Sequence, residues 1–304
     1  MSKRKLILAA LLSVMLLGGA QAEEKLKPFI LAGIQNGDVA SVATAVEGKL
    51  KSAGFEVPGR YSPYAGVTII GVTDDDLKQA AGKTDFGVFG AAMRVSVTQG
   101  KDGKIQVAYN NPLYLAAAYR MEADLSGTAA RLKKALGAQQ AFGSEEGLEK
   151  DDLEDYHYKW LMPYFTDRLE LAEYDSYDQA VQAVEAGLAA GKGGAKKVYR
   201  VDLPGKEATL FAVALTDKVS DECAGDAYIM ERIDFRDLKS SAHLPYEIVV
   251  KGNGAYALPA EFRIAINFPD LSMMGSNSFA SIMCAPGAIE EVLTMAAGGA
   301  TGED

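Results

Sequence analysis

The sequence predicts an α+β fold of two tandem β-α-β4-α units, each an antiparallel sheet with helices on one face. Two observations predict it. Short sequence matches recur in the same order in both halves of the 304-residue chain, at offsets between 138 and 157 residues. Each half also combines amphipathic helical patterns with several short apolar runs of strand length. Matches that keep their order at a similar offset indicate an internal duplication.

The matched segments are short and outline one repeated unit. They are residues 44–50 with 182–188, 73–82 with 216–225, and 89–97 with 242–250. After them, each half ends a strand-like run with the pattern Asn-x-Pro, beginning at Asn110 and at Asn267. Proline cannot donate to a strand ladder, and it holds the residue before it in an extended conformation. We therefore interpret Asn-x-Pro as the exit of the last strand in each unit.

In the first half, the elements follow from local patterns. Apolar residues recur at helical spacing over residues 39–50, and Gly54 follows as a helix-ending glycine. Residues 93–109 read as a hairpin because two strand-like runs flank a Lys-Asp-Gly turn. The expected elements are strand 27–34, helix 39–50, strand 66–72, hairpin 93–109 and a final helix from Ser126 to Leu136.

The second half repeats this order. The expected elements are strand 168–174, helix 181–188, strand 208–215, a hairpin over 246–266 with a loop four residues longer, and a final helix from Gly287 to Ala297. We expect domain boundaries at 23–140, 141–167 and 168–304, with the middle segment as a connector.

These motifs resemble a known family. The chain is similar to the domain of unknown function 302 family in five features. They are the helix, the Gly-Phe-x-Val at 54–57, the buried strand, the segment "HLPYEIVV" at 243–250 and the x-Pro exit. The resemblance covers residues 27–137 and 168–298 and implies a fold of the TATA-binding-protein-like type, without an established activity. Where that family carries a Cys-Asn-Pro-like turn, this chain has "GVTD" and "ALTD", so no activity is carried over from those turns.

Residues 1–22 have the pattern of a cleavable secretion signal. Lys3, Arg4 and Lys5 precede twelve apolar residues, and Ala20-x-Ala22 provides a small-residue cleavage site. Twelve helical residues span about 18 Å, which is shorter than a bilayer core of roughly 30 Å. We expect cleavage after Ala22 and a periplasmic or secreted mature protein.

The charge of the mature chain excludes some partners. Residues 23–304 carry 28 basic against 41 acidic side chains, a net charge of −13. Such a protein repels phosphate backbones and anionic lipids, so we expect neither nucleic acid nor a membrane surface as partner. We also expect no membrane span after signal cleavage. The sequence does not predict an oligomeric state.

The connector is first acidic and then aromatic, with Tyr156, Tyr158, Trp160, Tyr164 and Phe165 within ten residues. Its rings form either a stacking surface for a ligand or a packing layer between the two units. Because domain seams are favoured pocket locations, we predict a non-catalytic binding or accessory protein. Its partner would be a small apolar or planar ligand at the seam, or another envelope protein. The candidate ligand-binding residues are Tyr158, Trp160, Tyr164, His243 and Tyr246.

Cys223 and Cys284 are the two cysteines, an even count suited to an oxidising compartment, and we predict a disulfide between them. Two free thiols, or Cys284 as a soft metal ligand, are the alternatives. Thioether and thiolate ligands select Cu(I), so Met273, Met274 and Met283 are candidate copper ligands. Methionine is more often core filling. The sequence leaves any cofactor unknown.

An enzyme is the alternative function, with His243 and nearby carboxylates as its catalytic groups. The chain has two histidines, His157 and His243, and no Gly-x-Ser-x-Gly nucleophile motif. The acidic run Asp74–Asp76 lacks the spacing of a calcium loop. We interpret it as a helix start, where the helix dipole stabilises carboxylates.

Overall fold

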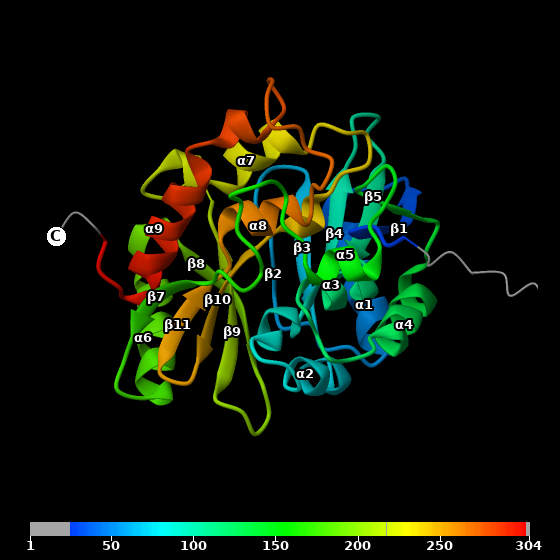
Figure 1. Ribbon diagram of the computed structural model, residues 1–304. Coiled ribbons are helices and arrows are strands. Elements are labelled where there is room, and N and C mark those ends of the chain that lie inside the picture. The colour runs from blue at the N-terminus through cyan, green and yellow to red at the C-terminus, as the bar shows by residue number, and fades with distance from the viewer. Residues whose placement is uncertain (1–24, 217, 302–304) are drawn as a thin grey trace, which may run out of the picture.

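The computed structural model describes residues 25–216 and 218–301, which form an α+β fold with two antiparallel sheets (Figure 1). The predicted signal segment and its cleavage site after Ala22 lie outside these residues.

The first sheet has six strands in the order β2-β3-β4-β5-β1-β6. Its strands are β1 (Phe29–Gln35), β2 (Arg60–Tyr61), β3 (Val67–Val72), β4 (Met93–Gln99), β5 (Ile105–Asn110) and β6 (Gln140–Phe142). All neighbours pair antiparallel. Since β6 pairs with β1, the first sheet reaches into the segment that we expected to be the connector.

The second sheet has five strands in the order β7-β11-β10-β9-β8. They are β7 (Leu169–Glu173), β8 (Lys196–Asp202), β9 (Ala208–Ala214), β10 (Tyr246–Lys251) and β11 (Gly254–Ala257). Taken in chain order, the first five strands of each half occupy the same relative places, with the first strand beside the fifth. The strands β4 and β10, which begin "MRVSV" and "YEIVV", are therefore in corresponding positions. Two tandem units would give this order, and their origin by duplication stays a prediction.

Two long helices pack against each sheet. They are α1 (Val39–Ser52) and α4 (Ser126–Leu136) on the first sheet, and α6 (Tyr177–Ala190) and α9 (Ala285–Ala297) on the second. Figure 1 shows these two helix pairs on opposite sides of the molecule. Side chains cap the first helix of each pair, since Asp38 accepts from Ser41 N and Ser176 accepts from Gln179 N. The bounds predicted for α4 are confirmed.

Shorter helices connect these elements. They are α2 (Asp75–Ala81), α3 (Pro112–Ala118), α5 (Lys150–Glu154), α7 (Asp226–Ile233) and α8 (Ala260–Ala265), with 3₁₀ turns at Gly87–Gly90, Lys192–Gly194, Glu222–Ala224, Ser241–His243 and Phe279–Ile282. The predicted helix start at the acidic run is confirmed. Asp74 caps α2 by accepting a hydrogen bond from Leu77 N, and Asp75 and Asp76 lie in its first turn.

The first Asn-x-Pro exits a strand as predicted, but the second does not. β5 ends at Asn110, Asn111 caps α3 and Pro112 is its first residue. In the second half, residues 252–253 make a two-residue turn between β10 and β11, so the hairpin ends at Ala257. The expected last strand before Asn267 is instead the buried helix α8. Pro259 precedes that helix and is the counterpart of Pro112, because both prolines follow the last hairpin strand.

The inner face of the first sheet is polar and is covered by a segment from the second half. Arg94 Nε and Asn110 Nδ2 both donate to the carbonyl oxygen of Ala242, at 3.2 and 3.0 Å. Thr98 bonds Ser241 through its hydroxyl at 3.2 Å. Further along, the Gln106 amide exchanges two hydrogen bonds with the Lys239 backbone. We call residues 239–242 the docking segment.

One described segment, Phe279–Ala297, is long and apolar enough by length and composition to cross a membrane. Core helices of folded proteins pass the same test. Here α9, which makes up most of the segment, packs against α6, β7 and α8.

Cys223 and Cys284 form a disulfide, with α-carbons 5.8 Å apart, and this prediction is confirmed. The bridge joins the 3₁₀ turn before α7 to the start of α9.

Replacing both cysteines by serine should lower the free energy of unfolding by about 2–4 kcal/mol, because the bridge restricts a long loop in the unfolded chain. The closed loop spans 61 residues. Chemical denaturation with and without reductant measures the effect. Reductant should lower the stability of the wild type and leave the double variant unchanged. Equal sensitivity of both proteins would contradict the assignment.

Candidate functional site

A cavity of about 310 Å³ opens where the two halves of the chain meet. One wall comes from β6 and the residues after it, and the other from the end of α7, the loop that follows it, and the residues after α8. Its lining residues include Phe142, Phe235, Leu238, Phe268 and Leu271. Concave sites at such seams are frequent ligand sites.

The aromatic walls are held from opposite sides. Phe142 is fixed by the pairing of β6 with β1 and packs on Phe29, with ring centroids 5.6 Å apart. Phe268 follows α8, and its ring packs edge-on against His243 at 5.5 Å. Phe235 follows α7 and is 44% exposed. The cavity therefore presents apolar ring surface from both halves.

Charged groups at the rim pair with one another. Arg236 Nη2 lies 3.2 Å from Glu145 Oε1 and 3.4 Å from Asp270 Oδ2. Glu145 N donates to Asp270, and Lys27 Nζ donates to the Glu145 carbonyl oxygen. Exposed pairs of this kind contribute little stability. Because their charges are already matched across the rim, the aromatic walls are the main surface of the cavity that is not engaged in ion pairs.

Asp234 also lines the cavity, and burial raises the pKa of its carboxyl to about 6. Both carboxyl oxygens accept from Ser240 N, at 3.0 and 3.1 Å, which closes the loop after α7. Lys239 Nζ donates to the Asp234 backbone carbonyl at 2.6 Å. This carboxyl therefore shapes the loop that carries Phe235 and Leu238.

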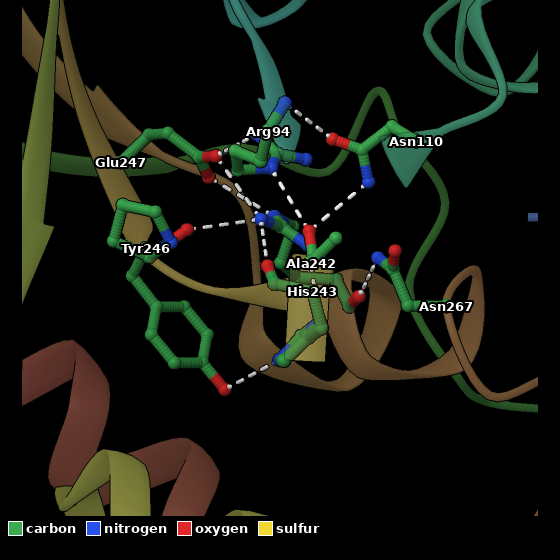
Figure 2. Close-up of polar contacts among 9 residues, drawn as sticks. Arg94, Asn110, Ala242, His243, Tyr246, Glu247 and Asn267 are labelled. Carbon is green, nitrogen blue, oxygen red and sulfur yellow. Dashed lines mark hydrogen bonds and ion pairs between the residues drawn. The ribbon is translucent and has the colours of Figure 1, made fainter. Parts of the chain in front are cut away.

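His243 and Tyr246, predicted as ligand-binding residues, lie in the interior between the sheets (Figure 2). Arg263 Nη1 lies 3.1 Å from His243 Nδ1, and Tyr246 Oη lies 3.3 Å from Nε2. Since arginine only donates, Nδ1 accepts and Nε2 carries the proton. Burial, with the charges of Arg263 and Arg94, holds the pKa of His243 well below its ordinary 6.5. A neutral, enclosed histidine in this position does not reach a substrate.

Beside His243 lies a buried ion network of Arg94, Glu247 and Arg263. Figure 2 labels Arg94 and Glu247 of this network. Arg94 Nη1 lies 2.6 Å from Glu247 Oε1. Arg263 binds both oxygens of the same carboxylate, through Nε and Nη2, each at 3.0 Å. Arg263 Nη2 also donates to the carbonyl oxygens of His243 and Pro245. The network joins β4 of the first sheet to β10 and α8 of the second half.

A second buried carboxyl joins the halves. Asp226, the first residue of α7, accepts through Oδ2 from Tyr61 Oη at 3.1 Å and from Leu215 N at 3.2 Å. Burial raises the pKa of Asp226 to about 8, against the lowering effect of these two donors. The group is therefore protonated in the folded protein at neutral pH.

The aromatic residues of the connector divide between packing and exposure. Phe165 is buried and its ring stacks on Tyr119 at 5.4 Å, while Tyr156 Oη donates to Ala265 O. Tyr158 packs on Phe279 and donates to Leu271 O. Tyr164 packs on His157, and Trp160 is 84% exposed. The rings before and after the exposed Trp160 pack against other residues, which supports the interpretation of the connector as a packing layer.

The five predicted ligand-binding residues do not form one site. His243 and Tyr246 contact each other in the interior, and Trp160 and Tyr164 line a separate pocket at the connector. None of them lines the cavity, since three lie in the connector and two in the interior. The aromatic residues that do line the cavity are Phe142, Phe235 and Phe268, which come from three segments far apart in the sequence. No local pattern of type or spacing in the sequence marks them as one site.

The three methionines predicted as copper ligands are exposed, Met274 and Met283 most of all. The alternative with Cys284 as a soft ligand is wrong for this structure, because its sulfur is bonded to Cys223. Within residues 25–216 and 218–301, no group of three His, Cys, Asp or Glu side chains is placed to hold a metal ion.

Comparison with known proteins gives no family. The chain matches no known protein family and no curated protein at a significant level. The resemblance to the domain of unknown function 302 family therefore stays an expectation.

Replacing Glu247 by glutamine should lower the free energy of unfolding by about 3–5 kcal/mol, because two buried guanidinium groups lose their counter-charge. Chemical denaturation measures the loss. Glu170→Gln, at an exposed position on β7, is the control and should stay within about 0.5 kcal/mol of the wild type. A Glu247→Gln protein as stable as this control would show that the network contributes nothing.

Because of Asp226, the free energy of unfolding should fall as the pH rises from 3.8, the ordinary pKa of an aspartate, to about 8, the pKa of Asp226 in the folded protein. In this window the unfolded chain has lost the proton that the folded protein keeps, so raising the pH favours unfolding. Asp226→Asn mimics the protonated acid and should flatten the decline, whereas the exposed Asp175→Asn should not. Denaturation midpoints across this range test it, and parallel curves for all three proteins would refute the assignment.

Proposed function

We propose that the protein is a non-catalytic binding protein, periplasmic or secreted, that holds a small apolar ligand between its two halves. The observation that carries the proposal is the cavity walled by Phe142 on one side and by Phe235 and Phe268 on the other. Apolar walls with a few polar groups at the edge are the usual composition of small-molecule sites.

The size of the cavity limits the ligand. About 310 Å³ lies at the lower end of ligand pockets, which suits a molecule of up to three rings. Planar ligands are favoured, because aromatic side chains gain most from stacked or edge-on contacts with another ring.

The polar groups of the cavity support binding rather than catalysis. Asp234 is engaged by Ser240 N, and Asp270 by Glu145 N and Ser144 Oγ. Glu145 pairs with Arg236. A general base must be free to take a proton from its substrate, and these three carboxyl groups already serve the loops that carry them.

The proposed location rests on residues 1–22 and on the cysteines. The signal pattern directs export, and the Cys223–Cys284 disulfide suits an oxidising compartment.

Phe235→Ala should weaken binding of a neutral apolar fluorophore, N-phenylnaphthylamine, about tenfold. Removing the covered part of one ring forfeits roughly 1.4 kcal/mol of contact. Fluorescence titration measures the affinity. Because Phe235 is partly exposed, the variant should stay folded, which circular dichroism and thermal unfolding check.

Trp160→Ala is the matched control, since it removes a larger ring that lies outside the cavity. It should bind the fluorophore like the wild type. Loss of binding in Trp160→Ala with retention in Phe235→Ala would place the ligand at the connector instead. No saturable binding by the wild type would overturn the proposal.

A further inference from the structure

The ion network between the sheets buries more positive than negative charge. Arg94 and Arg263 are each 1% exposed, and they share one carboxylate, that of Glu247. His243 is neutral, so it adds nothing to the balance. Two guanidinium groups against one carboxylate leave one positive charge, and uncompensated charge in a protein interior costs several kcal/mol.

Three buried donors near this charge find no hydrogen-bond partner among the described residues, Arg94 Nη2, Tyr119 Oη and Tyr199 Oη. The acceptor Asn267 Oδ1 is also unpartnered, and the Nδ2 of the same side chain donates to Arg263 O. In Figure 2 the contacts drawn from the Arg94 side chain run to Glu247 and Ala242. Buried donors are almost always paired, because an unpaired one keeps its full desolvation cost.

Tyr199 reaches Arg94 across the gap between the sheets. Its ring from β8 lies against Gly71 of β3, where an added Cβ would be 2.4 Å from Tyr199 Cε1. Gly71 is the register partner of Arg94 on β4, so the ring lies beside Arg94. The absence of a side chain at Gly71 is what allows this approach.

The charges of the ion network also act on the hydroxyl of Tyr199. Burial raises the pKa of Tyr199, which Arg94 and Arg263 lower, and Glu247 and Tyr119 raise. The hydroxyl therefore stays protonated and remains a donor. Tyr119 follows α3 and is held by its stack on Phe165.

We propose that Arg94 Nη2, Tyr119 Oη and Tyr199 Oη form an enclosed binding site for a monovalent anion of chloride size. Such an ion accepts hydrogen bonds from all three groups and balances the extra positive charge. A water molecule would accept hydrogen bonds from the donors but would leave the extra positive charge uncompensated. The three side chains are at most 3% exposed, which favours a monoatomic ion over a ligand that enters from solvent.

Refolding in different sodium salts at equal ionic strength tests the site. The unfolding midpoint of the wild type should be higher in chloride or bromide than in gluconate, which is too large to be enclosed, because an ion that binds only the folded state stabilises it. Crystals grown in bromide should show an anomalous peak beside Arg94, Tyr119 and Tyr199.

The variants Tyr119→Phe and Tyr199→Phe should reduce the difference between the salts. Tyr114→Phe is the control, since Tyr114 is equally buried but donates to Ile266 O at 2.7 Å. It should lower the midpoint in every salt and keep the difference.

A wild-type midpoint that does not depend on the anion, or a site without anomalous signal, would overturn the proposal in favour of an ordered water. A salt difference that Tyr199→Phe leaves unchanged would assign the effect to another part of the protein and overturn it equally. Neither result decides whether the cavity binds a ligand, which the fluorophore titration tests separately.

Discussion

The carboxylate of Glu247 is the contact on which the arrangement of the two sheets depends. Glu247 lies on β10, and its carboxylate binds Arg94 of β4 and Arg263 of α8. Charges buried this deeply are tolerated only with good geometry and full hydrogen bonding. A shift of one sheet against the other would break these bonds while keeping the charges out of water. The network therefore fixes the relative position of the halves more strictly than apolar packing alone would.

The cavity follows from that constraint. Arg94 and Asn110 hold Ala242, and Gln106 holds Lys239, so the docking segment lies in a fixed register along the inner face of the first sheet. Because this segment continues the loop after α7, it also fixes where Phe235 and Leu238 stand. Phe268 follows α8, whose Arg263 is a member of the network. Both parts of the second wall are thus tied to the first sheet, opposite Phe142.

Local patterns predicted the elements well and their assembly poorly. The predicted bounds of α4 agree with the structure, and so does the pairing of Cys223 with Cys284, which followed from the number of cysteines. The prediction of a strand at 261–266 is wrong, because Phe262, Ile264 and Ile266 alternate as in a strand while the segment forms the buried helix α8. The cavity was missed since its rings stand in three distant segments. Arginine is mostly exposed in proteins, so nothing in the sequence marked Arg94 and Arg263 as interior residues.

The polar inner face of the first sheet also determines where one wall of the cavity lies. An apolar seam would have bound the halves by area alone, with little preference for one register. The hydrogen bonds to the docking segment are directional, so the loop between α7 and β10 is positioned by the same groups that surround the proposed anion. An anion at the proposed site would compensate the charge of Arg94 in the position from which Arg94 donates to Ala242 O. The cavity wall and the buried charge are therefore coupled through one backbone segment, although ligand and anion never meet.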